Sequence, residues 1–290
     1  SFAIMTVQNM SRMFYGCDSI KKITLPKSLV RIEPEAIRYC DGLESLVLPS
    51  GIEQIASYAV ANNKHLKTLY ISQNLKYIDP GAFSGCTALE TIYCDCTRDE
   101  YFGSAEYIGL DNDPLYDANF IQLSGKCGTN GNYTYDPTEA TLTVSGTGAM
   151  DDFTGSATPT GNLQPRPWYD FKDDIKHIVV ENGVTKIGKD AFEYCRNVET
   201  AEIGNTVQSI GNYAFDQCAA LTSVQLPESV TTIGTQAFGN CDSLIEAVIP
   251  GNVAVIPTCA FVDCPVLESI LIPATVTLIK SNAFYKCPSL

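Results

Sequence analysis

One pattern returns along this chain every 23 residues, and no other feature limits the fold as strongly. From Ala214 it reads Ala-Phe-x-x-Cys-x-x-Leu-x-x-Val-x-Leu-Pro-x-x-Val-x-x-Ile-Gly, and it starts again at Ala237. A fixed period of this length is typical of solenoids, in which each repeat buries its apolar side only by stacking on its neighbours. We therefore predict a repeat solenoid that binds along an extended surface.

Within one repeat the apolar spacing changes character. From Ile233 to Leu244 the apolar residues are spaced by three or four, which predicts a short helical turn. Val224 and Leu226 alternate with a polar residue, which predicts a short strand that Pro227 closes. We expect an α/β solenoid with short parallel strands on one face and short helical turns on the other.

The period is interrupted between Cys96 and Phe171. The first part of the gap holds a capping box at residues 97–100, which predicts a short helix, and an apolar run at 120–123, which predicts a strand. The second part holds two alternating segments, Tyr133–Tyr135 and Ala140–Val144, around a turn, which predicts a hairpin.

The gap predicts two domains, because the open ends of a solenoid expose apolar surface and need caps. Residues 1–123 are expected to form a first array closed by the helix and strand, and residues 124–290 a hairpin cap followed by a second array. We expect both ends of the sequence to be cut, since the second array stops in the middle of a repeat.

Most of the cysteines share one column of the repeat. They are Cys17, Cys40, Cys86, Cys195, Cys218, Cys241, Cys264 and Cys287. Such a column stacks into a ladder inside the core, where a free thiol is a suitable small apolar group. Parallel side chains are poorly placed for the torsion of a disulfide, and the sequence has no Cys-x-x-Cys pairs or histidine partners for a metal site. Cys94, Cys96, Cys127 and Cys259 lie off the ladder, and a Cys96–Cys127 bond between the caps stays open.

Asn63 replaces cysteine in one repeat of the ladder column. A buried amide needs hydrogen-bond partners. We expect Asn63 to bond backbone groups within the ladder and not to contact a ligand.

The net charge of −14, from 19 basic and 33 acidic residues, argues against nucleic acid and against anionic membranes as partners. No apolar run is long enough to cross a membrane. His65 and His177 have no nucleophile and acid at motif spacing, and the acidic run at 111–113 lacks the glycine and closing glutamate of a calcium loop. The paired acids at 151–152 and 173–174 fit a solvated surface. We expect no enzyme activity, no metal and no cofactor.

The outward columns of the predicted sheet are the best place to look for a ligand, since strand side chains alternate. Aromatic, apolar and polar groups together are typical of recognition surfaces. The candidate residues are Tyr70, Tyr93, Thr68, Thr91 and Val47 in the first array, and Glu202, Gln225, Val248 and Leu271 in the second. The alternative is that these side chains only pack along the sheet or against the other domain.

The repeat closely resembles that of the BspA-like leucine-rich repeat family, over both arrays. The first cap also resembles that family's terminal module at Tyr93, at residues 97–101 and at residues 108–115, although Tyr101 stands at a usual tryptophan and Cys96 at a usual glycine. The segment from Gly125 to Ala149 resembles the leading cap of such arrays.

The resemblance implies a bacterial protein that is secreted or displayed on the cell surface and adheres to host matrix or other cells. The expected function is therefore non-enzymatic binding of a protein ligand through the exposed sheet face. The alternative is a structural spacer that displays another module and has no ligand of its own.

Overall fold

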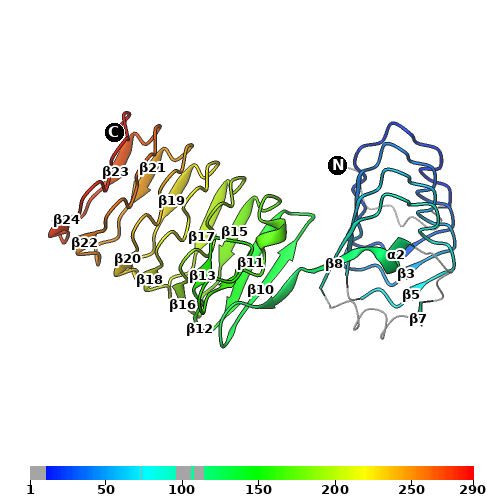
Figure 1. Cartoon of the computed structure of the whole chain (residues 1–290), viewed down its shortest axis with the longest axis horizontal. Coiled ribbons are helices and arrows are strands. Elements are labelled where there is room, and N and C mark those ends of the chain that lie inside the picture. Colours follow the sequence, from blue (N-terminus) through cyan, green and yellow to red (C-terminus); the bar gives the residue numbers. More distant parts are fainter. Residues whose placement is uncertain (1–10, 73, 96–105, 108–113) are drawn as a thin grey trace. The chain divides into compact units, whose positions relative to one another are not determined.

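The computed structural model describes residues 11–72, 74–95, 106–107 and 114–290, and the chain divides into two compact units, residues 1–123 and 124–290 (Figure 1). Each unit is built from short, mostly parallel strands. The candidate capping box at 97–100, the acidic run at 111–113 and Cys96 lie outside the described residues.

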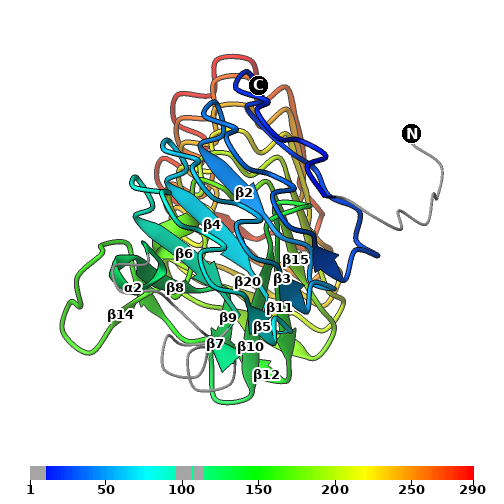
Figure 2. The same ribbon diagram turned by 90° about the vertical axis from the view of Figure 1, so that its right-hand side faces the viewer.

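The first unit contains two sheets whose strands are parallel. One has the order β2 (Ser45–Val47), β4 (Thr68–Ile71), β6 (Thr91–Cys94), β8 (Asn119–Gln122), and these strands lie side by side in Figure 2. The other has the order β1 (Arg31–Ile32), β3 (Gln54–Ile55), β5 (Tyr77–Ile78), β7 (Glu106–Tyr107). Apolar side chains of both sheets form one core. The strand predicted at 120–123 is observed as β8.

The second unit begins with the predicted hairpin. Strand β10 (Gly131–Asp136) pairs antiparallel with β11 (Thr141–Gly146), and β9 (Ser124–Lys126) pairs with the other edge of β10. In the turn between β10 and β11, the Asp136 carboxylate accepts a hydrogen bond from the backbone N–H of Thr138 at 2.8 Å. The first strand of the repeats, β15 (His177–Val180), then pairs parallel with β11.

The repeats of the second unit follow one another from β15 to β24 (Figure 1). One side carries β17 (Thr200–Ile203), β19 (Ser223–Gln225), β21 (Glu246–Val248) and β23 (Ser269–Leu271). The other side carries β12 (Gly148–Ala149), β16 (Val184–Ile187), β18 (Ser209–Ile210) and β20 (Thr232–Ile233), followed by β22 (Val255–Ile256) and β24 (Leu278–Ile279). A separate pair is formed by β13 (Phe153–Thr154) and β14 (Gln164–Pro165).

The expected helical turns are wrong. In the described part of the chain the helical segments are α2 (Pro114–Asp117) and the 3-10 helix η1 (Tyr169–Phe171), and neither lies in an Ala-Phe segment. We call the backbone of one repeat a coil. Where helix was predicted, backbone N–H groups donate to the next coil and not within their own: Phe215 N–H donates to Ala237 O at 2.8 Å and Gln217 N–H to Gly239 O at 3.0 Å. Gln217 also has a φ of 63°. Donation to the next coil and left-handed residues both prevent the i to i−4 bonding of a helix.

Aromatic stacking runs through the core of the second unit. Phe192, Phe215, Phe238 and Phe261 are fully buried, and successive ring centroids lie 5.1 to 5.4 Å apart. Trp168 extends the row, since its ring stacks on Phe192 at 5.6 Å and its Nε1–H donates to Ala191 O at 2.8 Å. The loop before the repeats therefore supplies one more rung of the same core.

The cysteine column bonds to backbone one coil earlier. The Sγ of Cys218 donates to Phe192 O at 3.3 Å, and Cys241 and Cys264 repeat this contact with Phe215 and Phe238. These thiols are free and buried, and burial raises the pKa of Cys218 well above its ordinary value. The column of the first unit also holds Cys17, Cys40 and Cys86, and only position 63 is an asparagine.

Asn63 makes the bonds that the sequence predicted. Its Nδ2 donates to Ile37 O at 2.7 Å and to Val60 O at 2.6 Å, and its Oδ1 accepts the N–H of Cys40 at 2.7 Å. All of these atoms are buried, so the amide is satisfied within the core.

Candidate binding surface

The sheet face of the second unit is open to solvent. Strand alternation points every second side chain outward, and Thr200, Glu202, Ser223 and Gln225 are exposed along β17 and β19. Further along, Val248 is 36% exposed and Leu271 64%. Of these residues, Glu202, Gln225, Val248 and Leu271 are the positions that the sequence predicted for a ligand in the second array.

The sheet face of the first unit exposes less than alternation alone suggests. Tyr70 and Tyr93 stack on each other with ring centroids 4.6 Å apart and planes at 15°, but only 9% and 8% of their surface is accessible. Val47, Thr68 and Thr91 are half-buried. Strand alternation predicts the side of the sheet on which a residue lies, but it does not predict whether other groups cover that side. Because the tyrosines are covered, they offer little contact area to a ligand.

The sheet of the second unit is interrupted between β17 and β19. Strands β15 and β17 are paired, and so are β19, β21 and β23, but β17 and β19 belong to different sheets. In the preceding coil, Glu199 N–H donates to Lys176 O at 2.7 Å and Gly204 N–H to Val180 O at 2.7 Å. Across the interruption, Pro227 takes the place of Gly204 and has no N–H to donate.

The interruption coincides with a change in strand ends. The coils of β15 and β17 end in Glu181 and Gly204, which keep a backbone donor, whereas later coils end in proline at 227, 250 and 273. The four-residue strands β15 and β17 thus meet the three-residue strands that follow. The inward residues Ala201 and Ile203 are only half-buried at this place, while Val224 is 2% exposed.

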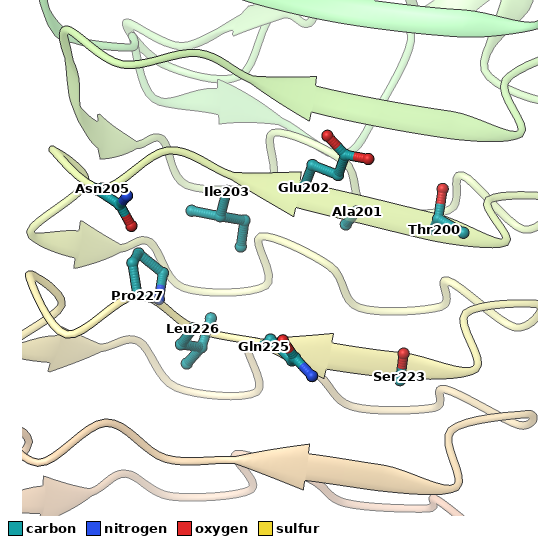
Figure 3. A pocket seen from close by; sticks show the side chains of 9 residues that line it. All are labelled: Thr200, Ala201, Glu202, Ile203, Asn205, Ser223, Gln225, Leu226 and Pro227. Atoms are coloured by element: carbon teal, nitrogen blue, oxygen red, sulfur yellow. The ribbon is translucent and has the colours of Figure 1, made fainter.

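A cavity of about 400 Å³ lies over the interruption. It is lined by Thr200, Ala201, Glu202, Ile203, Asn205, Ser223, Gln225, Leu226 and Pro227. Ile203 and Asn205 point toward the coil of β19, and the ring of Pro227 points back toward the coil of β17 (Figure 3). An apolar base is thus surrounded by hydroxyl, amide and carboxylate groups.

A second cavity, of about 440 Å³, adjoins the first on the side of β15. Its lining includes Val179, Glu181 and Asn182, and it shares Glu202 and Ile203 with the first cavity. The Glu202 side chain points toward the preceding strand in Figure 3. We call the two cavities together the seam recess, defined by residues 179–182, 200–205 and 223–227.

The electrostatics of this region are one-sided. Residues 197–279, which lie between Arg196 and Lys280, contain no lysine, arginine or histidine but eight acidic residues. Glu199 is paired with Lys176 at 3.0 Å. Within the described residues, the exposed carboxylates of Glu181 and Glu202 have no hydrogen bond or ion pair with the protein. The seam recess is therefore a region of negative potential without an internal counter-ion.

The other polar residues singled out from the sequence have structural partners. His65 Nδ1 contacts Asp41 O at 2.9 Å, and His177 Nδ1 contacts Thr200 Oγ1 at 2.8 Å. Asp152 pairs with Lys186 at 2.7 Å; burial alone would raise its pKa, but bonds from Lys186 and the Lys189 N–H lower it. In the residues that the structure describes, no group of three His, Cys, Asp or Glu side chains is arranged to hold a metal ion.

The outward columns of the sequence predicted only part of this site. They include Glu202 and Gln225, but the cavity is also lined by the half-buried Ala201 and Ile203 and by the neighbouring Asn205 and Pro227. Two signals were present: the change from glycine to proline at the strand end and the absence of basic residues from 197 to 279.

Comparison with known proteins gives one family. A family model described as "BspA type Leucine rich repeat region" matches residues 10–105 and 167–290, in six copies. No curated protein matches the chain significantly. Among the described helices, none is long and apolar enough to cross a membrane.

Solved structures of bacterial repeat proteins are similar to this chain. A leucine-rich repeat protein of T. pallidum is 23% identical over 57% of this chain and 80% of its own, with a TM-score of 0.41. One from Bacteroides ovatus is 25% identical over 96% and 67%, with a TM-score of 0.37. A leucine rich cell surface protein of Faecalibacterium prausnitzii is 23% identical over 97% of this chain and 55% of its own, with a TM-score of 0.32.

Proposed function

Because the chain belongs to the family of BspA-type leucine-rich repeat proteins, we propose that it is a non-enzymatic binding protein whose ligand is another protein. The contact runs along the sheet face, mainly that of the second unit. The observation that carries this proposal is the open face from Thr200 to Leu271, with the seam recess at one end and apolar side chains at the other.

The composition of the face supports protein recognition. Recognition surfaces combine a few apolar anchors with a polar surrounding. Leu271 and Val248 are exposed apolar groups on neighbouring paired strands, and Glu202 and Gln225 are exposed polar groups on the strands before them. In the first unit, Tyr70 and Tyr93 contribute a smaller contact with Thr68, Thr91 and Val47 around them.

The architecture proposed for this role is a pair of tandem solenoids. Residues 1–123 form an array with a cap at its C-terminal end, and residues 124–290 form a second array that begins with the hairpin cap. Pairing of β11 with β15 supports the hairpin as a cap, because β11 covers the open edge of the first strand of the repeats. The protein acts outside the cell or on its surface, in adhesion to host matrix or to other cells.

The test is adhesion with matched variants. Beads coated with the chain are presented to immobilised fibronectin, laminin and collagen and to cultured epithelial cells. Val248→Asp should reduce attachment by about tenfold, which corresponds to a loss of about 1.4 kcal/mol of contact free energy when a charge is placed on the face. Val266→Asp is the control, since Val266 is 40% exposed but lies in a turn away from the sheet.

Two results would contradict the proposal. Equal attachment by Val248→Asp and Val266→Asp would remove the sheet face as the contact. Coated beads that attach to none of these surfaces would favour the alternative function, a spacer that displays another module.

A further inference from the structure

We infer that the seam recess binds a cationic side chain, an arginine or lysine carried by an extended segment of the partner protein. This inference rests on the proposed function and names the chemistry of the partner at one place on the same face. It follows from the charge of the recess, from the arrangement of its lining, and from the charge of the surrounding coils.

The local charge of the seam recess favours a cationic ligand. Glu202 lines both cavities and Glu181 lines one, whereas neither cavity is lined by a lysine, arginine or histidine. Both glutamates are exposed, and in the described structure neither is paired with a cation of the protein. Glu199 shows the contrast, because Lys176 already neutralises it. A ligand cation would supply the missing partner for the two carboxylates.

The lining of the seam recess is arranged to accept a long side chain with a charged end. Arginine and lysine carry an apolar stem below a charged head, and they bury the stem while the head stays polar. The base of the cavity over the interruption is apolar, with Ala201, Ile203 and Leu226, and acceptor groups lie around it on Glu202 and Gln225. Cavities of about 300 Å³ and more accept small ligands, so one side chain fits in about 400 Å³.

The interrupted sheet adds backbone to this site. In the coil before, the carbonyl of Val180 accepts a hydrogen bond from Gly204 N–H at 2.7 Å. The equivalent carbonyl, that of Ile203, faces Pro227, which has no N–H. A guanidinium has five N–H donors in a fixed plane and can bond a carboxylate and neighbouring oxygens together. Arginine is therefore favoured over lysine.

The charge of the surrounding repeats also favours a cationic partner. The coils from residue 197 to 279 carry eight acidic residues and no lysine, arginine or histidine. A surface with one sign of charge attracts partners of the opposite sign and increases their association rate. The same field repels nucleic acid and anionic membranes, which leaves a basic protein segment as the occupant.

The experiment measures binding of a short basic peptide to the full chain. The probe is a fluorescein-labelled peptide of four Gly-Arg repeats, and a peptide of Gly-Gln repeats is the neutral comparison. Binding of each peptide is measured by fluorescence anisotropy at low salt. Glu202→Gln should weaken binding about tenfold, and Glu181→Gln less, since Glu181 lines only one cavity. Glu268→Gln is the matched control, because Glu268 is exposed on a later coil and outside the recess.

A gain of charge gives an independent readout. Gln225→Lys places a cation in the recess and should abolish binding of the arginine peptide, and the fluorescence of the buried Trp168 checks that each variant is folded. Equal loss for Glu202→Gln and Glu268→Gln, or equal binding of the neutral peptide, would overturn the inference.

The peptide and adhesion experiments separate two kinds of failure. If Val248→Asp reduces adhesion while Glu202→Gln leaves peptide binding unchanged, the sheet face is a contact surface and the cationic site is wrong. If Glu202→Gln weakens peptide binding while Val248→Asp has no effect on adhesion, the cationic site exists and the proposed function is wrong.

Discussion

The two units share the core of their repeat and differ in the faces that surround it. On the sheet face of the first unit, Tyr70 and Tyr93 stack together and are almost fully covered. On that of the second unit, polar and apolar side chains are open to solvent from Thr200 to Leu271, and the sheet itself is interrupted. The repeated positions therefore form the buried core of both units, whereas the outward columns differ between the units in how much of their surface is exposed.

The two units also differ in the cysteine column of their cores. One position of this column in the first unit holds an amide, whereas the column of the second unit has only thiols. Cys218→Asp should destabilise the second unit by about 4 kcal/mol or more, since a carboxylate cannot donate to Phe192 O and its charge would be buried. Chemical denaturation followed by Trp168 fluorescence measures this, because Trp168 is the single tryptophan and lies in the second unit.

The control is Cys218→Asn. Asn63 shows that an amide in this column can donate to a carbonyl of the preceding coil, so asparagine should cost less than about 2 kcal/mol. If asparagine and aspartate are equally costly at position 218, the two columns are not equivalent.

Asn63→Ala should cost about 3 kcal/mol in the first unit. The change leaves the N–H of Cys40 without an acceptor and removes the donor to Ile37 O and Val60 O, all within the core. Cys218→Ala should cost only about 1 kcal/mol, because a thiol is a weak donor and a small group. Far-UV circular dichroism should show the Asn63→Ala loss while Trp168 fluorescence stays unchanged; a shift of both signals would mean that the units unfold together.

Tyr70→Ala tests the covered face of the first unit, with a loss of about 2 kcal/mol expected from the buried ring and its stacking on Tyr93. Val248→Ala on the open face of the second unit should change stability by less than about 0.5 kcal/mol. The free energies of unfolding of both variants check this. Similar losses at the two positions would show that the faces are equally covered.

One glutamate in each unit, Glu193 in the second and Glu35 in the first, should make the stability of its unit depend on pH in opposite directions. Burial, together with Asp190 and Asp216, raises the pKa of Glu193 to about 7 against the opposing effect of Arg166 and Lys189. A raised carboxyl pKa contributes stability at low pH that is lost as the pH rises from about 4.5 to about 7. Glu193→Gln should therefore raise the Tm by a few degrees at pH 8 and have little effect near pH 4.5.

In the first unit, the hydrogen bond from Arg12 and a further one from Arg38 lower the pKa of Glu35 against desolvation. Its stabilising effect is present above the ordinary pKa of a glutamate and is lost as the pH falls. Glu35→Gln should therefore lower the Tm slightly at pH 8. Thermal melts between pH 4 and pH 8 compare the two variants, and parallel pH profiles would contradict the assignment.

The sequence predicted those features that depend on repeated residues. Alternation around Val224 predicted the strand observed as β19, and the segments flanking the turn at Asp136 predicted the hairpin of β10 and β11. Parallel pairing of consecutive coils also followed, with Ser45 opposite Thr68 and Ser223 opposite Glu246. In these cases each side chain's environment is decided by its neighbours in the same column.

The features that sequence missed depend on backbone conformation or on distant contacts. Apolar spacing of three or four around Phe215 fits a helix, but it cannot show that the N–H of Phe215 donates to the next coil. The outward position of Tyr70 was readable, whereas the surface that covers it was not. The sheet interruption has only a weak signal, because Pro250 and Pro273 stand in the same column as Pro227 within a continuous sheet.

The central claim, that a partner binds over the interrupted sheet of the second unit, is tested most directly by amide hydrogen exchange with and without the arginine peptide. The amides of Ser223 and Gln225 lie on the edge of β19 that faces the interruption, whereas Thr200 N–H, at the same position one coil earlier, donates to Lys176 O at 3.4 Å. We predict that the two β19 amides exchange faster than that of Thr200 in the free chain and slow down when the peptide is bound. Equal protection in the free chain, with no change on addition of the peptide, would contradict the account.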